Sequence, residues 1–284
     1  MTTGTITYGS FTATTDSTVG PKLIDVRGLD GWDGEAEVYR LISNHGGIPG
    51  AGFTRPRTFQ LTFALLGSDP VSLQTQRAAL RAAFNPREGD EQDLVLSWPS
   101  APVVQIACRP VSRVGSLGVH TPTMSIQLVA SDPALYSSSL AQTVIPVFVG
   151  TGGLSYDVTY DKDYGAAGAG EGTDIANAGD WETWARFEIT GPSSGTLQPL
   201  SIENVTTGDS ITFTGLQVPT GSTLIVETHP ARRTVMFSDG VSRWNTVTAV
   251  QWWPIDAGGA SLRFRATGDT TGVVCTCITR AAYL

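Results

Sequence analysis

Residues Gly191 to Gly195 have the G-x-S-x-G spacing that surrounds the nucleophilic serine of many hydrolases. In those enzymes a strand runs through a sharp turn directly into a helix, which lifts the serine hydroxyl toward a histidine. Here no helical pattern follows the motif, and it comes directly after a strand-like stretch at residues 187–190. We therefore interpret Gly191 to Gly195 as a turn and Ser193 as a turn residue.

The three histidines, His45, His120 and His229, each stand alone in a loop-like stretch. A general base needs a nucleophile within hydrogen-bond reach, and a helical zinc motif needs two histidines one turn apart. Neither spacing is present, so none of the three is predicted to be catalytic or to bind a metal.

Two glycine-rich stretches and one acidic stretch suggest binding loops at first sight. Gly46-Gly47 and residues 168–172 lie outside any strand-to-helix turn and lack a following Lys-Ser/Thr, so they do not predict a phosphate cradle. Asp157, Asp161 and Asp163 lack the distant glutamate of a calcium loop. We expect no catalytic, cofactor-binding or metal-binding residue in this chain.

Three tryptophans, Trp244, Trp252 and Trp253, offer a better functional lead because exposed indole rings stack on sugars or anchor protein interfaces. Neighbouring residues of a strand point to opposite faces, so Trp252-Trp253 would send one ring inward and the other outward. We expect at least one in the core. A carbohydrate-binding module or adhesin that uses these tryptophans is the alternative function, and loss of glycan affinity in Trp244→Ala or Trp252→Ala would favour it.

A glycosidase would need two carboxylates about 5–10 Å apart across a cleft. The available glutamates of the second half are Glu182, Glu188, Glu203 and Glu227, and no motif pairs them. We do not expect an enzyme.

The size and composition favour two β-rich domains, although a single large β domain would also fit. The chain has 284 residues with a mass of 30.0 kDa, 40% hydrophobic and 15% charged residues, and 32 glycines, a balance typical of strands joined by tight turns. The formal net charge is −8 and the pI is near 4.8. Such a charge argues against a nucleic-acid-binding surface or a basic membrane-binding face, because both need clustered Lys and Arg.

Cys108, Cys275 and Cys277 are an odd number of cysteines, and the last two share a face of a predicted strand, where they are poorly placed to bridge. We expect no disulfide framework. The start Met1-Thr2-Thr3-Gly4 lacks a signal-peptide pattern, and no apolar run approaches the roughly 18–20 residues that span a bilayer. The prediction is a soluble protein made in the cytoplasm, with no membrane insertion.

In the first half, residues 57–65 alternate apolar and polar side chains, the period of a half-buried strand. Asp69-Pro70 then caps an amphipathic helix of about four turns that ends at Asn85-Pro86. Further strands are predicted at residues 94–98, 103–108 and 123–128. Residues 1–140 are thus predicted to form an α+β domain with one main helix.

Residues 141–182 are predicted to be a linker or insert, since residues 164–172 are too glycine-rich to order themselves. Residues 183–284 are predicted to be a β-sandwich of about seven short strands separated by turns. The strands are centred on residues 187–189, 200–202, 211–213, 224–226, 235–237, 262–264 and 273–278. Asp239-Gly240 is the clearest hairpin signal.

In order along the chain, these segments resemble the distal tail proteins of long-tailed, non-contractile phages, also described as phage tail-like or minor tail proteins. The resemblance covers nearly the whole chain. In the first half it rests on Val26 to Gly31, the strand from Arg57 to Leu66, the helix from Leu73 to Phe84, and the closing segment Leu128 to Tyr136. In the second half it rests on Asn177 to Asp180, Phe187 to Pro192, Ile202 to Asp209, and Gly221 to Thr228 before the Asp239-Gly240 hairpin.

The resemblance implies a mainly β fold, with an N-terminal α+β tail-tube-like domain followed by a C-terminal galectin-like β-sandwich, a name that carries no sugar-binding claim. It implies a homohexameric ring at the distal end of the virion tail, where it joins the tail tube to the tip. The implied partners are the tail tube protein, the tape measure protein, a tail-associated hub protein and receptor-binding proteins. DNA would pass through the lumen without specific binding.

The sequence departs from the expected pattern at Ala257 to Ser261 and in the long insert between about Tyr156 and Gly172. Two hypotheses follow from the ring. Because basic clusters would hold DNA, we expect an acidic lumen face. Because a ring closes through heterologous contacts, we expect residues 30–50 and first-domain strands to contact the neighbouring subunit.

Overall fold

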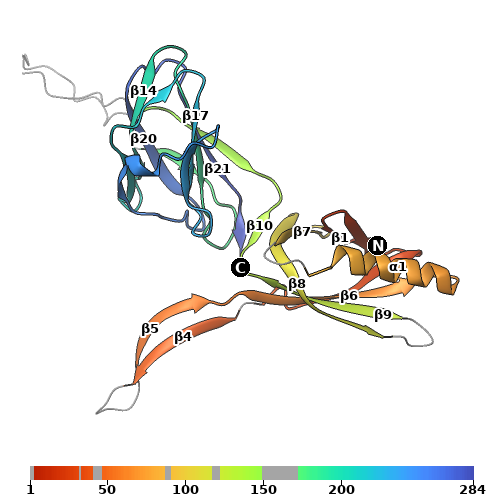
Figure 1. Ribbon diagram of the computed structural model, residues 1–284. Coiled ribbons are helices and arrows are strands. Elements are labelled where there is room, and N and C mark those ends of the chain that lie inside the picture. Colours follow the sequence, from red (N-terminus) through yellow and green to blue (C-terminus); the bar gives the residue numbers. More distant parts are fainter. Residues whose placement is uncertain (1–2, 32, 41–46, 87–90, 117–121, 149–171) are drawn as a thin grey trace, which may run out of the picture. The chain divides into compact units, whose positions relative to one another are not determined.

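The computed structural model describes residues 3–31, 33–40, 47–86, 91–116, 122–148 and 172–284 (Figure 1). The chain divides into unit 1, Met1–Ser139 with Tyr283–Leu284, and unit 2, Leu140–Ala282. Each unit has its own hydrophobic core. Among the described residues, no helix is both long and apolar enough to cross a bilayer.

Unit 1 is built on a closed barrel. The strand order is β8-β7-β1-β2-β3-β6-β9, and β9 pairs back onto β8. The barrel strands are β1 (Thr5–Tyr8), β2 (Phe11–Thr14), β3 (Gly20–Arg27), β6 (Arg57–Leu66), β7 (Gln92–Ser97), β8 (Val104–Ser116) and β9 (Thr123–Ala130). The short strands β10 (Leu135–Ser137) and β22 (Ala282–Tyr283) extend the sheet beyond β8. Because the sheet closes on itself, few strand edges are exposed, and the inward-facing side chains fill the barrel.

The barrel core follows from alternation along the strands. In β6 the side chains of Phe59, Leu61, Phe63 and Leu65 are buried, as their period of two predicts. Neighbouring strands contribute further buried residues in the same way. They include Ile6, Tyr8, Leu23, Leu94, Leu96, Ile106, Met124, Ile126 and Leu128.

One helix, α1 (Pro70–Ala83), packs against this core, as the sequence predicts. Asp69 is the N-cap, and its side chain accepts a hydrogen bond of 2.9 Å from the Ser72 amide, while Pro70 occupies the first turn. Leu80 and the C-cap residue Phe84 are buried against the barrel. The cap, the proline and the apolar spacing together fix where the helix begins and which side it buries.

Asp69→Ala is expected to destabilise unit 1 by about 1 kcal/mol, because the first-turn amides lose their side-chain acceptor. Asp69→Asn is the matched control, since its side-chain oxygen can still accept the bond, and it should retain most of the stability. Urea unfolding followed by circular dichroism measures both. Equal losses in the two variants would contradict the capping role.

Unit 2 consists of two sheets around a common core. One sheet has the order β11-β21-β13-β17-β18 and the other the order β12-β20-β14-β15-β19, with β16 on β14. The first contains β11 (Ala141–Ile145), β21 (Val274–Thr279), β13 (Arg186–Thr190), β17 (Thr223–Glu227) and β18 (Thr234–Phe237). The second contains β12 (Thr173–Ile175), β20 (Ala260–Gly268), β14 (Thr196–Asn204), β15 (Ser210–Phe213), β16 (Val218–Pro219) and β19 (Val247–Val250).

Buried side chains from both sheets form a single cluster, among them Phe187, Ile189, Phe213 and Phe264. The sequence-based strands of this half are confirmed, and so is the Asp239-Gly240 turn. There Gly240 adopts a φ of +87° and its amide donates to the Phe237 carbonyl at 2.9 Å. Two sheets that share one core form a β-sandwich.

The predicted linker at residues 141–182 needs correction at both ends. Ala141–Ile145 is strand β11, paired with β21, and Thr173–Ile175 is strand β12, paired with β20. Sequence alone gave no sign of these pairings because each partner lies more than eighty residues away along the chain. The chain also returns at its end, where Tyr283 and Leu284 belong to unit 1 rather than to the second domain.

The three cysteines are free and buried. Cys275 and Cys277 lie on the inward face of β21, as the spacing predicts, and Cys108 lies in the barrel core. Burial raises the pKa of all three thiols, that of Cys277 to about 12. At neutral pH they therefore behave as small apolar side chains and not as nucleophiles.

Candidate functional surfaces

The G-x-S-x-G stretch is a turn, as interpreted from the sequence. Ser193 donates to the Thr271 carbonyl at 3.2 Å, and Ser194 donates to the Asp269 carboxylate at 2.7 Å. The backbone amide of Thr271, followed by the Ser194 hydroxyl, lowers the pKa of Asp269. These hydrogen bonds tie two loops together, and neither serine hydroxyl is directed at a histidine.

Other chemistry-bearing residues have structural partners. His229 lies edge-on to Trp184, with ring centroids 6.3 Å apart, and its Nδ1 accepts the Ala231 amide. Glu188 pairs with Arg186 at 2.6 Å, and Glu203 pairs with Arg265 at 2.8 Å. Within the part of the chain that is described, no group of His, Cys, Asp and Glu side chains could hold a metal ion.

Several residues considered from the sequence lie outside the described residues. They are His45, His120, Gly46, Asp157, Asp161, Asp163 and residues 168–171. Gly47 begins strand β5 (Gly47–Thr54) rather than a loop that could cradle a phosphate.

The tryptophans divide as the alternation predicts. Trp253 is buried in the core of unit 2, whereas Trp252 is only partly buried and stacks on Trp244, with ring centroids 5.7 Å apart and an interplanar angle of 19°. The guanidinium of Arg233 lies 5.5 Å from the Trp252 ring and 5.9 Å from the Trp184 ring. Arg233 thus joins two aromatic groups through cation–π contacts, a role that the sequence pattern did not signal.

This arrangement limits a sugar platform. A platform needs open ring faces, but Trp252 is already contacted by Trp244 and by Arg233. Trp244 is the tryptophan of this group with a large exposed area, at 46%. A carbohydrate-binding function would therefore depend on a sugar stacking on Trp244 alone. Trp252→Ala would affect such binding mainly by removing the ring on which Trp244 stacks.

Two of the segments on which the family resemblance rests, Val26 to Gly31 and Asn177 to Asp180, hold neighbouring parts of the chain together through buried contacts. Gly28 adopts a φ of +79°, and a Cβ there would lie 2.8 Å from the Thr58 carbonyl oxygen. The next residue, Leu29, is buried, and its carbonyl accepts a hydrogen bond from the buried Arg57 guanidinium. Desolvation lowers the pKa of Arg57, partly offset by Asp30 and Asp132.

In the second of these segments, in unit 2, Asn177 is buried, with 3% of its surface exposed. Its amide nitrogen donates to the carbonyls of Trp181, Ile255 and Asp256, at 2.7, 3.2 and 3.2 Å. Its oxygen accepts the amide of Gly179 at 3.1 Å. The segment from Asn177 to Asp180 therefore holds several loops together and has a structural role.

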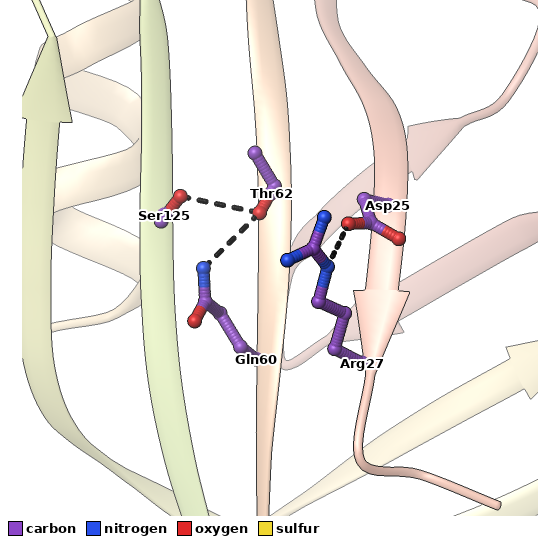
Figure 2. A network of polar contacts seen from close by, with 5 residues as sticks. All are labelled: Asp25, Arg27, Gln60, Thr62 and Ser125. Carbon is purple, nitrogen blue, oxygen red and sulfur yellow. Dashed lines mark hydrogen bonds and ion pairs between the residues drawn. The ribbon is translucent and has the colours of Figure 1, made fainter.

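The outward face of the barrel strands β3, β6 and β9 carries a polar network (Figure 2). Thr62 lies at its centre, 3.1 Å from the Ser125 hydroxyl and 3.4 Å from the Gln60 amide, while Arg27 pairs with Asp25. Apart from that internally balanced pair, the side chains of the network are neutral. These five side chains therefore offer hydrogen bonds without a net charge.

The acidity of the chain is concentrated in unit 2. Unit 1 carries 10 Lys and Arg against 12 Asp and Glu, while unit 2 carries 8 against 14, so the formal net charges are −2 and −6. The overall charge of −8 is therefore a weak guide to the surface of unit 1.

A two-stranded sheet stands apart from the barrel. Strands β4 (Gly34–Arg40) and β5 (Gly47–Thr54) pair with each other and, within the described residues, with no other strand (Figure 1). Phe53 on β5 is 66% exposed. A lone two-stranded hairpin is marginally stable in water, and a large exposed aromatic ring adds an apolar surface that a partner could cover.

No protein-family model matches the sequence, and no curated protein matches it. Solved structures do. The Dit (gp 19.1) protein of phage SPP1, described as a paradigm of the hub adsorption apparatus of phages that infect Gram-positive bacteria, matches with a TM-score of 0.69 and 14% identity over 99% of both chains.

Chains of the phage p2 baseplate in its activated conformation, with Ca and with Sr, match at TM-scores of 0.53 and 0.52. Their identities are 11% and 12%, over 99% of this chain and 98% of those chains. These similarities span both units. The chain therefore has the fold of phage distal tail and baseplate proteins, and the resemblance drawn from its sequence is confirmed at the level of the fold.

Proposed function

We propose that this chain is a structural subunit of the tip of a long, non-contractile phage tail. Copies form a ring, a homohexamer, at the distal end of the virion tail, where it joins the tail tube to the tip and its receptor-binding proteins. The match to SPP1 Dit over 99% of both chains carries the proposal, because it covers the barrel and the sandwich together.

The β4–β5 hairpin supports a subunit contact. It leaves the barrel, pairs only with itself among the described residues, and carries the exposed Phe53. A ring closes when one surface of each subunit meets a different surface of the next. We assign the hairpin as one of these surfaces and a neighbour's unit 1 as the other.

Phe53→Asp is expected to weaken assembly, since an aromatic residue that is a hot spot of an interface contributes about 2 kcal/mol or more, or roughly 30-fold in the dissociation constant. Trp244→Ala is the matched control, because it removes an exposed aromatic ring from unit 2. Mass photometry over a dilution series measures both. A Phe53→Asp variant that dissociates at the same concentration as the wild type would remove the hairpin from the interface.

The lumen would need a surface that lets DNA slide. The network on β3, β6 and β9 is the best candidate, since its groups are neutral or internally paired and cannot hold phosphates as a basic cluster would (Figure 2). The near balance of charge in unit 1 favours a neutral wall over the acidic one expected from the whole sequence.

Unit 2 would be displayed around the ring as a galectin-like sandwich. The tail tube protein, the tape measure protein and a tail-associated hub protein are the proposed partners of the ring. Crosslinking of the assembled protein followed by mass spectrometry tests the arrangement. Contacts between subunits should include residues 30–54, and contacts confined to residues after Trp184 would contradict it.

A further inference from the structure

A pocket in unit 2 has no role in the proposed assembly. Its volume is about 340 Å³, at the lower end of the range of small-molecule sites, and it opens between the start of β14, the loop before β16, the end of β18 and the 3₁₀ turn Trp244–Thr246. It is lined by Thr196, Gly215, Leu216, Gln217, Pro219, Phe237, Arg243 and Thr246. The lining contains one charged side chain, an arginine, and no carboxylate.

Arg243 has no counter-charge among the residues that the structure describes. Its guanidinium lies 4.7 Å from the centre of the Phe237 ring, and its Nε is buried without a hydrogen-bond partner. No ion pair or side-chain hydrogen bond of Arg243 occurs within the described residues. The planar guanidinium of a partly buried arginine without an acid can bind a carboxylate or phosphate group through charge-assisted hydrogen bonds.

The other lining residues narrow the class of ligand. The hydroxyl of Thr196 and the amide of Gln217 make no hydrogen bond within the described residues, so both are available to a polar ligand. Pro219 is exposed and adds apolar surface of the kind on which the carbon face of a sugar ring packs, while Leu216 and Phe237 are buried beneath it. We propose that the pocket binds a saccharide residue carrying a carboxylate or phosphate group, with Arg243 as the anion-binding side chain.

Saturation-transfer NMR on the full chain tests this, with glucuronate and glucose 1-phosphate as probes and glucose as the neutral control. At least one anionic probe should bind, and glucose should bind at least about tenfold more weakly. Arg243→Gln should weaken the anionic probe by about tenfold or more. Arg232→Gln is the matched control, since Arg232 is exposed in the same unit and does not line the pocket.

Gln217→Glu is a second test variant, and it avoids changing the partly buried Arg243. Gln217 is exposed, so the substitution should leave the fold intact, while its new carboxylate should repel an anionic probe. The proposal is overturned if neither anionic probe binds the wild type or if glucose binds equally well. It is also overturned if Arg232→Gln weakens binding as much as Arg243→Gln, or if Gln217→Glu leaves it unchanged.

Discussion

Phe84→Ala is expected to destabilise unit 1 by about 3–5 kcal/mol, the range for removing a buried phenylalanine. Phe84 is 1% exposed and ends α1 within an aromatic cluster. Its ring stacks on that of Tyr8, with ring centroids 4.7 Å apart and an interplanar angle of 4°. The ring centroids of Phe11 and Phe63 lie 5.6 Å and 5.9 Å from that of Phe84. Truncation therefore removes the contact that holds the end of the helix on the barrel.

Val71→Ala is the matched control on the same helix, because Val71 is 72% exposed and its truncation should cost less than about 0.5 kcal/mol. Hydrogen exchange followed by mass spectrometry separates the two units within the full chain. Phe84→Ala should accelerate exchange in the peptides of unit 1 and not in those of unit 2. Unchanged exchange across β6 and β7 would show that the cluster does not stabilise the barrel.

Asn177→Leu is expected to destabilise unit 2 by about 3–4 kcal/mol. Leucine matches asparagine roughly in shape but cannot replace the hydrogen bonds to Trp181, Ile255 and Asp256, and each buried carbonyl left without a partner costs about 1–3 kcal/mol. Urea unfolding monitored by tryptophan fluorescence measures the loss, because five of the seven tryptophans lie in unit 2.

Asn245→Leu is the control for this substitution, since Asn245 is exposed on the 3₁₀ turn and has no such bonds. It should lie within about 0.5 kcal/mol of the wild type. If both variants unfold alike, Asn177 does not hold the loops together in the way its contacts indicate.

The sequence predicts those elements whose signals are local. Strand β6 has four apolar residues at a period of two, α1 has a capping aspartate and a proline in its first turn, and Asp239-Gly240 supplies the turn after β18. In each case neighbouring residues along the chain decide the structure. Their positions were therefore predictable before any pairing was known.

Long-range pairing was not predictable in this way. The barrel closes because β8 pairs with β9 as well as with β7. The sequences of β8 and β9 contain no pattern that predicts this second pairing. Strand β11 pairs with β21, about 130 residues later, so its five residues read as linker. These contacts depend on the three-dimensional packing of both partners, which periodicity cannot show.

The candidate surfaces also divide into features that adjacent residues predict and features that depend on long-range contacts. The Trp252-Trp253 alternation correctly predicts one buried ring, because it depends on adjacent residues. The contacts of Arg233 and Arg243 were missed, because their partners come from other loops and strands. A basic residue without a nearby acid in sequence was the available signal, and it is too common to single out a site.

Imaging of the purified full chain by electron microscopy tests the central claim most directly. Six copies around an open centre are expected, with density for the β4–β5 hairpin reaching the adjacent copy. Compact particles without a central opening, or single subunits at every concentration, would contradict a tail-tip ring.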